Sequence, residues 1–312
     1  MADQVTLFEV GPRDGLQNEK DIIDTSVKIE LIERLVSSGL RKIEATSFVN
    51  PKWIPQLADA ADVLNRIQRE PGVVYSALVP NIRGLERAKK AEIQEIAVFM
   101  SSSEAHNKSN INKTIAETYP VLREVVEAGM AAGMRVRGYV STAFGCPYEG
   151  DVSLASVARV TEGLLHMGVY EVSIGDTIGV GTPGQVKERF VSLIEQFGAE
   201  RLAGHFHDTR GTGLANVYAA FEAGIRTFDS SIGGLGGCPY APGASGNIST
   251  EDVVYMLHGM GVETGVNLEK LVETGAFIER VLQRTLPSRV LAAMKNTGKE
   301  GECGNEQYTA GQ

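Results

Sequence analysis

The stretch YEVSIGDTIGVGTPGQVKERFVSLIEQFGAERLAGHF, residues 170–206, contains the repeating unit of this chain. It begins with a short β-branched run at 170–174, continues into an amphipathic segment at Pro183–Phe197, and ends in a second apolar run at 202–206. Thr182 can cap the amphipathic segment as a helix, and Pro183 suits a first helical turn. A strand, a helix and a strand in this order predict two parallel strands joined by a crossover helix.

The same unit recurs along the whole chain. Short β-branched runs predict strands at 5–10, 41–46, 73–79, 95–100, 134–141, 170–174, 202–206 and 226–231, and amphipathic stretches such as Val27–Ser38 and Ser156–Met167 predict helices between them. Eight β/α units are the number that closes a barrel, whereas a doubly wound open sheet is the alternative. We therefore expect an α/β protein, a (β/α)8 TIM barrel with additional C-terminal helices. A single catalytic domain is expected over residues 1–294, followed by a polar, flexible tail over 295–312.

Composition narrows the classes of function. The 312 residues include 43% hydrophobic residues and 35 glycines that do not recur every third position, which excludes a disordered or collagen-like chain. A net charge of −9 argues against nucleic acid or an anionic membrane as the main partner. The three cysteines, Cys146, Cys238 and Cys303, form no C-x-x-C pair and support neither a disulfide framework nor a zinc ribbon. With no leader peptide or long apolar run in the sequence, we expect a cytoplasmic protein.

The strongest chemical signal is the pair His205 and His207 at the predicted seventh strand. Side chains alternate along a strand, so both imidazoles project to one face, about 7 Å apart, where they could share a metal ion. Asp208 or a backbone carbonyl could orient one ring. The alternative is a pair of neutral, hydrogen-bonded histidines. Asp14 is the best additional ligand, because the first and seventh strands lie two positions apart in a closed eight-stranded barrel.

Two further strand ends carry charged residues, where a barrel of this type places its catalytic groups. Arg13 and Asp14 follow the first strand, although an ordinary Asp-Gly turn with a solvated arginine would give the same residues. Glu44 lies in the second strand, where it either faces the helix layer with a partner or lines the mouth of the barrel. The sequence leaves both alternatives open.

A glycine-rich segment follows the eighth strand, with six glycines among residues 233–247. A flexible linker needs no Cys238, tyrosine, prolines or terminal Asn247, so a mobile lid accounts better for this mixture. Asn247 could add an amide oxygen to the ligand set of Asp14, His205 and His207. Two nitrogen and two oxygen ligands suit Mg²⁺ or Mn²⁺ better than a closed zinc site.

Two other motifs have simpler interpretations. The segment Gly179–Gly184 matches G-x-G-x-x-G, but its position late in a barrel favours a helix N-terminus that lines the site over a dinucleotide fold. Cys146 is interpreted as a small packed residue and not as a nucleophile.

Several segments together carry a family resemblance. They are VGPRDGLQNE (10–19), TSFV (46–49), RGYVS (137–141), GCPYEG (145–150), GDTIGVGTPG (175–184), the His205-x-His207-Asp208 pattern and the glycine-rich segment with its Gly-Gly-Cys-Pro-Tyr sequence. Over residues 5 to 285 the chain resembles the 3-hydroxy-3-methylglutaryl-CoA lyase family, within a wider group of metal-dependent barrel lyases and condensing enzymes.

The resemblance implies cleavage of 3-hydroxy-3-methylglutaryl-CoA to acetyl-CoA and acetoacetate, a reverse Claisen reaction of leucine degradation and ketone body formation. It implies a divalent cation, Mg²⁺ or Mn²⁺, and a homodimer. The implied metal ligands are Asp14, His205, His207 and Asn247. The implied catalytic residues are Arg13, which neutralises the enolate, Cys238, which acts as the acid, and Asp176 and Glu44. One of these two carboxylates, or a metal-bound water, assists deprotonation of the substrate hydroxyl. The implied substrate contacts are Arg13, Gln17, Lys20, Ser47, Arg137, Tyr139 and Ser173. Lys20 and the loop around Asn107–Lys113 are candidate coenzyme A contacts, and the alternative is that they are solvated surface residues.

Arg210 departs from the family pattern, in which several relatives have an aromatic residue. An extra cation beside the metal could change the preferred acyl chain. The alternatives are therefore a lyase for a related 3-hydroxyacyl-CoA, such as citramalyl-CoA or a longer-branched glutaryl-CoA, and a synthase that condenses acetyl-CoA with a 2-oxo acid. Cys303 could be a redox-sensitive thiol or incidental.

Overall fold

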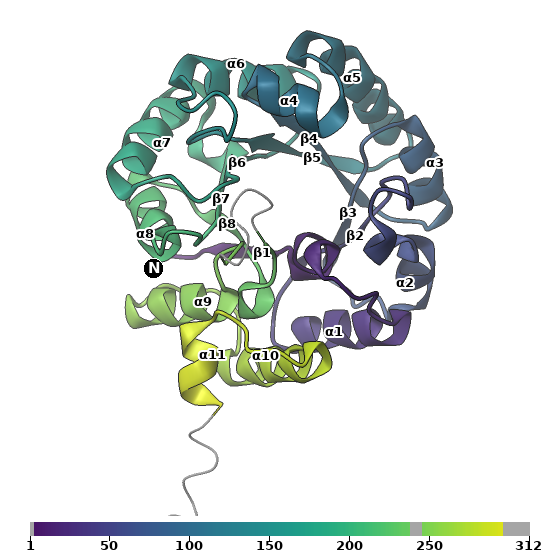
Figure 1. Ribbon diagram of the computed structural model, residues 1–312, viewed down its shortest axis with the longest axis vertical. Helices are drawn as coiled ribbons and strands as arrows, with labels where there is room; N and C mark the ends of the chain where they lie inside the picture. The colour runs from purple at the N-terminus through teal and green to yellow at the C-terminus, as the bar shows by residue number, and fades with distance from the viewer. Residues whose placement is uncertain (1–2, 238–244, 296–312) are drawn as a thin grey trace, which may run out of the picture.

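The computed structural model describes residues 3–237 and 245–295, and within them eight parallel strands close into a barrel in sequence order (Figure 1). β1 pairs with both β2 and β8, which closes the sheet. The strands are β1 Thr6–Glu9, β2 Lys42–Ser47, β3 Val74–Leu78, β4 Glu95–Ser101, β5 Arg135–Ser141, β6 Val172–Asp176, β7 Leu202–Phe206 and β8 Thr227–Ser230. The predicted TIM barrel is confirmed, and each strand lies where its β-branched run predicted it.

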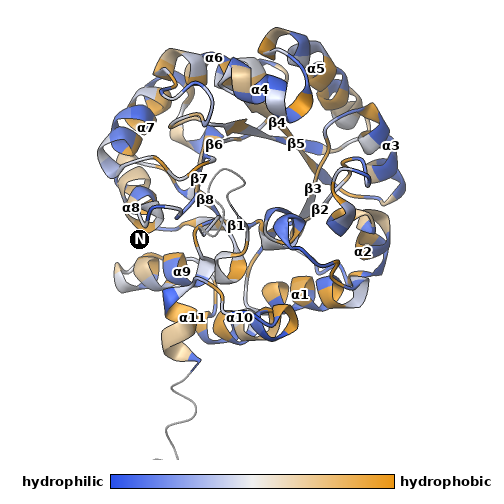
Figure 2. Ribbon diagram, in the orientation of Figure 1, coloured by the Kyte–Doolittle hydropathy of each residue, from blue (hydrophilic) through white to orange (hydrophobic). Residues whose placement is uncertain are grey.

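Helices surround the barrel, and three of them follow the last strand, as expected (Figure 1). They are α1 Thr25–Ser37, α2 Ala60–Arg66, α3 Ile82–Lys90, α4 Glu104–Ile111, α5 Ile115–Ala131, α6 Leu154–His166, α7 Pro183–Phe197, α8 Gly213–Ala223, α9 Thr250–Gly259, α10 Leu268–Leu282 and α11 Arg289–Met294. Their apolar stripes pack on the strands and their polar faces point outward (Figure 2). In α1 the buried stripe is Ile29, Leu31, Ile32, Leu35 and Val36, the set that its spacing predicted.

Local capping chemistry explains several helix starts. Asn81 accepts a hydrogen bond from the Gly84 amide at the start of α3, and Thr114 with Glu117 forms a reciprocal capping box at α5. Thr182 occupies the position before α7, but its side chain makes no capping hydrogen bond, so that part of the sequence prediction is wrong. Pro183 does begin the helix.

The C-terminal part of the fold covers the region next to β1 and β8. Lys295, which the sequence assigned to the tail, donates hydrogen bonds to Glu279 on α10 at 2.6 and 2.9 Å. The remainder of the predicted tail, including Cys303, lies outside the described residues. Among the helices described, none is both long enough and apolar enough to cross a membrane.

Candidate active site

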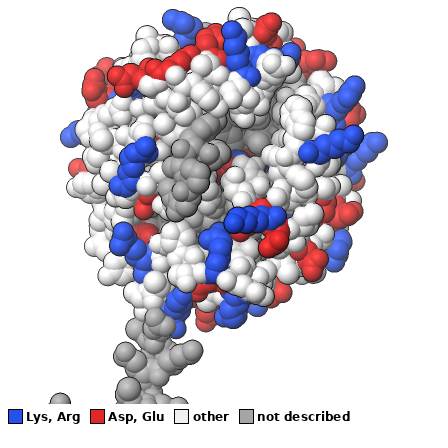
Figure 3. All heavy atoms as spheres, in the orientation of Figure 1, with Lys and Arg blue, Asp and Glu red and all other residues white. Residues whose placement is uncertain are grey.

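A cavity of about 800 Å³ opens at the carboxyl ends of the strands. Figure 3 shows the hollow at the centre of this face, with Lys and Arg side chains gathered on the side over α3. The base of the cavity is lined by Arg13, Asp14, Tyr139, His205 and His207. In a barrel of this kind the catalytic groups lie at this face.

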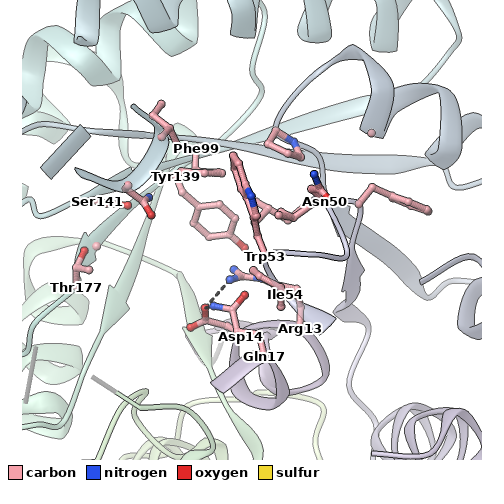
Figure 4. A pocket seen from close by; sticks show the side chains of 18 of the residues that line it. Arg13, Asp14, Gln17, Asn50, Trp53, Ile54, Phe99, Tyr139, Ser141 and Thr177 are labelled. Atoms are coloured by element: carbon pink, nitrogen blue, oxygen red, sulfur yellow. Dashed lines mark hydrogen bonds and ion pairs between the residues drawn. The ribbon is translucent and has the colours of Figure 1, made fainter. Parts of the chain in front are cut away.

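The tight turn Gly11–Gly15 (η1) directly after β1 brings Arg13 and Asp14 into the cavity (Figure 4). A Cβ on Gly11 would lie 2.6 Å from a carboxylate oxygen of Glu9 and 2.9 Å from Ile232 Cγ2, so a larger residue there would displace these side chains. Arg13 is buried between two carboxylates: its Nη1 lies 2.5 Å from Asp14 Oδ1, and its Nε lies 2.5 Å from Glu44 Oε2. The arginine is therefore a structured part of the site and not a solvated turn residue.

Asp14, His205 and His207 offer ligand atoms that all lie within 4.8 Å of one another. Burial alone would raise the pKa of Asp14, but the charges of Arg13, His205 and His207 outweigh it and bring that pKa to about 2. Burial, reinforced by His205, lowers the pKa of His207 to about 4, so its imidazole is neutral at pH 7. Its buried Nδ1 has no hydrogen-bond partner among the described residues. An ionised carboxylate and a neutral imidazole with an unused nitrogen fit a divalent cation, and the cluster is a candidate metal site.

Asn247 lies beside this cluster at the end of the glycine-rich segment. Its Nδ2 donates to Asp14 Oδ2 at 2.8 Å and to the Leu235 carbonyl at 3.2 Å. Its backbone forms an isolated antiparallel β-bridge with that of His207. Gly236 has a φ of +127°, and a Cβ there would lie 2.8 Å from the side-chain nitrogen Nδ2 of Asn247. This glycine lets the two ends of the segment approach the site. Cys238, which lies between them in the sequence, is outside the described residues.

His205 is oriented by a residue that the sequence reasoning missed. Its Nδ1 lies 3.2 Å from Asp229 Oδ2, whereas the carboxylate of Asp208, the predicted partner, accepts the Gly213 amide at 2.8 Å instead. Asp229 lies inside β8, pairs in register with His205 and is 1% exposed. An aspartate inside a predicted barrel strand was the available signal, but the partner could be identified only from the strand register.

The predicted substrate contacts divide into two groups. Arg13, Gln17 and Tyr139 line the cavity, and the Tyr139 hydroxyl is buried without a hydrogen-bond partner among the described residues. The other four do not belong to the cavity wall that the described residues form. Lys20 is exposed, and the Ser47 hydroxyl accepts a hydrogen bond from the Val49 amide at 3.1 Å. Arg137 and Ser173 are fully buried against Asp229. Arg137 and Ser173 both donate hydrogen bonds to Asp229 beneath the site, so the described structure does not bring them to the cavity.

The two candidate bases occupy different environments. Burial raises the pKa of both Glu44 and Asp176. Glu44 contacts Arg13 through Oε2, while its buried Oε1 has no hydrogen-bond partner among the described residues. Both oxygens of Asp176 accept backbone amides, from Val180 at 3.0 Å and Gly181 at 2.9 Å. The first amides of the G-x-G-x-x-G segment thus hold Asp176, and residues 179–184 are not part of the described cavity wall.

Arg210 and Cys146 each contact other groups of the protein. Arg210 donates through Nη1 to the carbonyls of Ile178 at 2.8 Å and Gly179 at 3.0 Å, and it does not belong to the described cavity wall. Arg210, expected as an extra cation beside the metal, instead links its own loop to the loop of Ile178 and Gly179. Cys146 is buried with its sulfur 2.9 Å from the Ser103 hydroxyl, which agrees with a packed residue.

The outer part of the cavity carries residues that the sequence reasoning did not single out. Trp53, Arg83 and Arg87 line it together with Asn110 and Ile111. The last two belong to Asn107–Lys113, the predicted loop, which is helical as far as Ile111 because it forms the end of α4. The guanidinium of Arg87 stacks on the Phe48 ring, 5.1 Å from its centroid, and Trp53 is 73% exposed. Arg83 and Arg87 gave no signal in the sequence because cations are common on exposed helix faces. Trp53 lies in a turn between β2 and the short helix Pro55–Leu57, where no motif marked it.

Comparisons with known proteins agree with this geometry. The chain is 54% identical over 290 residues to the mitochondrial hydroxymethylglutaryl-CoA lyase of Bos taurus, covering 93% of this chain and 89% of that protein. It superposes on the crystal structure of the Bacillus subtilis HMG-CoA lyase with a TM-score of 0.93 and 53% identity, covering 94% and 98% of the two chains.

A further solved relative is an HMG-CoA lyase from Acinetobacter baumannii in complex with coenzyme A and 3-methylmalate, with a TM-score of 0.90, 41% identity and coverage of 95% and 96%. The HMGL-like family model matches residues 4–278. With a match over most of its length and relatives above 50% identity, this chain belongs to the HMGL-like family.

Proposed function

We propose that this chain is a lyase that cleaves 3-hydroxy-3-methylglutaryl-CoA to acetyl-CoA and acetoacetate. The observation that carries the proposal is the cluster of Asp14, His205 and His207 beside a buried Arg13, at the base of a deep cavity. The names of the relatives supply the substrate and the reaction. In the reaction the substrate hydroxyl loses its proton, its O–H electrons form the new carbonyl, and the C–C bond electrons pass to the α-carbon of the departing acetyl-CoA.

Three side chains account for the two proton transfers and for the stabilisation of the negative charge. Glu44 is the better candidate base of the two, because its Oε1 has no partner among the described residues, whereas both oxygens of Asp176 accept backbone amides. Arg13 would stabilise the enolate oxygen with a guanidinium that is already held in place. Cys238 remains our candidate for the acid that protonates the α-carbon.

The metal site is proposed to hold Mg²⁺ or Mn²⁺ through Asp14, His205, His207 and Asn247. The mixed oxygen and nitrogen donors suit these ions. When bound, a divalent cation supplies Lewis-acid chemistry that favours loss of the hydroxyl proton. The amide of Asn247 has its nitrogen toward Asp14 here, so it would have to turn its oxygen toward the ion.

Coenzyme A is proposed to enter along the outer wall of the cavity. A thioester with a long pantetheine arm needs an extended channel, and its phosphates need cations at the mouth. Arg83 and Arg87 on α3 supply those cations, and the exposed Trp53 offers an aromatic face for a base. These residues replace Lys20 as our first candidates for the phosphate contacts.

A substrate panel tests the proposed reaction. We expect release of acetoacetate and acetyl-CoA from 3-hydroxy-3-methylglutaryl-CoA, with citramalyl-CoA and a longer-branched glutaryl-CoA cleaved more slowly. The Arg210 geometry supports this order, because that cation contacts loop carbonyls and not the cavity. Faster cleavage of either other thioester would assign the chain to that substrate, and condensation of acetyl-CoA with a 2-oxo acid would assign it to a synthase.

Three further properties belong to this proposal: a homodimer, a cytoplasmic location and a place in leucine degradation and ketone body formation. The dimer is directly testable by a mass measurement in solution, where a monomer at micromolar concentration would contradict it.

A further inference from the structure

We propose that Asp229, anchored by Arg137 and Ser173, is a positioning residue that fixes His205 in the tautomer with its proton on Nδ1 and its lone pair on Nε2. The inference rests on the metal site proposed above, since Nε2 is then the His205 atom available to a cation. It extends that site to a layer of the barrel interior that does not touch substrate.

The carboxylate of Asp229 receives donors on both oxygens. Arg137 Nη2 donates to Oδ1 at 2.7 Å, Ser173 Oγ donates to Oδ2 at 2.7 Å, and His205 Nδ1 lies 3.2 Å from Oδ2. A carboxylate ion-paired with a guanidinium is an anion and can only accept hydrogen bonds. The His205 nitrogen that faces it must therefore carry the hydrogen, which leaves the other ring nitrogen with its lone pair.

Arg137 is itself immobilised, so Asp229 cannot turn away. Its guanidinium carbon lies 4.3 Å from the centre of the Phe8 ring and 5.0 Å from that of Tyr139, and its Nε donates to Glu171 at 2.8 Å. The side chain is fully buried. Because Tyr139 lines the cavity, one guanidinium supports both the cavity wall and the carboxylate that orients His205.

Stability alone does not account for this buried cluster. Removing charges from water is costly, and apolar side chains of similar volume often replace a buried ion pair with no loss of stability. The bonds from Arg137 and Ser173 converge on the one carboxylate that contacts His205. A carboxylate behind a ligating histidine fixes the ring orientation and makes it a better ligand.

Mn²⁺ affinity, measured by electron paramagnetic resonance on the substrate-free protein, tests this role. We expect Asp229→Asn to weaken Mn²⁺ binding by about 10–100-fold. The matched control is Glu171→Gln, which removes a charge from the other side of the same guanidinium without touching His205, and it should bind Mn²⁺ as the wild type does. Unchanged affinity in a folded Asp229→Asn protein, or an equal loss in both variants, would overturn the positioning role.

The tautomer gives a second readout that needs no variant of Asp229. Imidazole ¹⁵N chemical shifts of the metal-free wild type at pH 8, with His205 assigned by the signal lost in His205→Ala, should show hydrogen on Nδ1. Hydrogen on Nε2 would overturn the proposal even if Asp229→Asn failed to fold. Neither measurement uses the acyl-CoA substrate, so a chain that lacks the proposed lyase activity could still pass both.

Discussion

Arg13 is the residue on which the charges at the base of the cavity depend. It holds Asp14 through Nη1 and Glu44 through Nε, and its guanidinium lies 5.6 Å from the centre of the Tyr139 ring. Two carboxylates therefore share one buried cation. A fixed guanidinium of this kind can stabilise developing negative charge without reorganising during the reaction.

Loss of that cation should affect turnover more than binding. For Arg13→Gln we expect kcat to fall by about 10²–10³, because one preorganised donor to the enolate is lost, while KM changes little. Arg34→Gln, on the exposed face of α1 where Arg34 pairs with Glu30, is the matched control and should turn over normally. Steady-state kinetics on both variants checks this, and near-normal kcat in folded Arg13→Gln would contradict the role of Arg13.

Arg87 should affect substrate binding and leave the chemistry intact. Arg87→Ala is expected to raise KM for the acyl-CoA about tenfold, which corresponds to the loss of about 1.4 kcal/mol of binding, with kcat unchanged. The same variant should have no effect on the acyl-pantetheine thioester, which lacks the phosphates. Lys90→Ala, exposed on the same helix and away from the described cavity wall, is the control. An equal rise in KM for both substrates would exclude a phosphate contact.

Among the structural elements, β1 is linked through Glu9 to three other segments behind the site. Its Oε1 accepts the Gly11 amide of the turn Gly11–Gly15 and the Ile232 amide after β8, both at 2.8 Å, and its Oε2 accepts the Thr250 hydroxyl of α9 at 2.6 Å. Complete burial raises its pKa to about 7, against 4.5 for an ordinary glutamate. The last residue of β1 thus connects the turn of Arg13 to the root of the glycine-rich segment.

This raised pKa predicts how stability depends on pH. The folded protein holds the Glu9 proton more tightly than the unfolded chain does, so this contribution is present below about pH 4.5 and is lost as the pH rises through about 7. Relative to Glu9→Gln, the wild type should lose up to about 3 kcal/mol of unfolding free energy over that range. Urea unfolding at several pH values measures the difference, with the exposed Glu30→Gln as control. If the difference in unfolding free energy between the wild type and Glu9→Gln did not change with pH, Glu9 would be shown to ionise normally.

Strands and helices were predictable because their signals are local. The β-branched runs and the apolar stripe of α1 are set by neighbours a few residues apart, and the boundaries of α7 agree with the sequence prediction. Thr182 failed as a cap because a suitable residue type does not fix the direction of its side chain.

Contacts across the barrel were less predictable. Asp14 could be placed near the histidines from strand order alone, because a closed barrel sets which strands are neighbours. Asp229 and Arg137 could not be placed, since their contact depends on the registers of the strand pairs from β5 to β8 and on which strand face points inward. Strand order was enough to predict that the candidate ligand Asp14 lies near the histidines, whereas the residues behind them could be placed only from the three-dimensional structure.

For the molecule as a whole, the barrel collects side chains from distant parts of the sequence at one face. Asp14 follows β1, His205 and His207 lie at the end of β7, and Asn247 follows β8. The chain shares this architecture with HMG-CoA lyases over more than nine-tenths of its length. The central claim is that this site cleaves the substrate with a metal ion held by the cluster of Asp14, His205 and His207.

Acetoacetate release from 3-hydroxy-3-methylglutaryl-CoA after exhaustive chelation, followed by return of Mg²⁺ or Mn²⁺, tests that claim most directly. We expect activity to disappear on chelation and to return with either ion in the wild type, and to stay absent in a folded His207→Ala protein at every metal concentration tried. Full turnover in the chelated wild type, or wild-type turnover in His207→Ala, would contradict it.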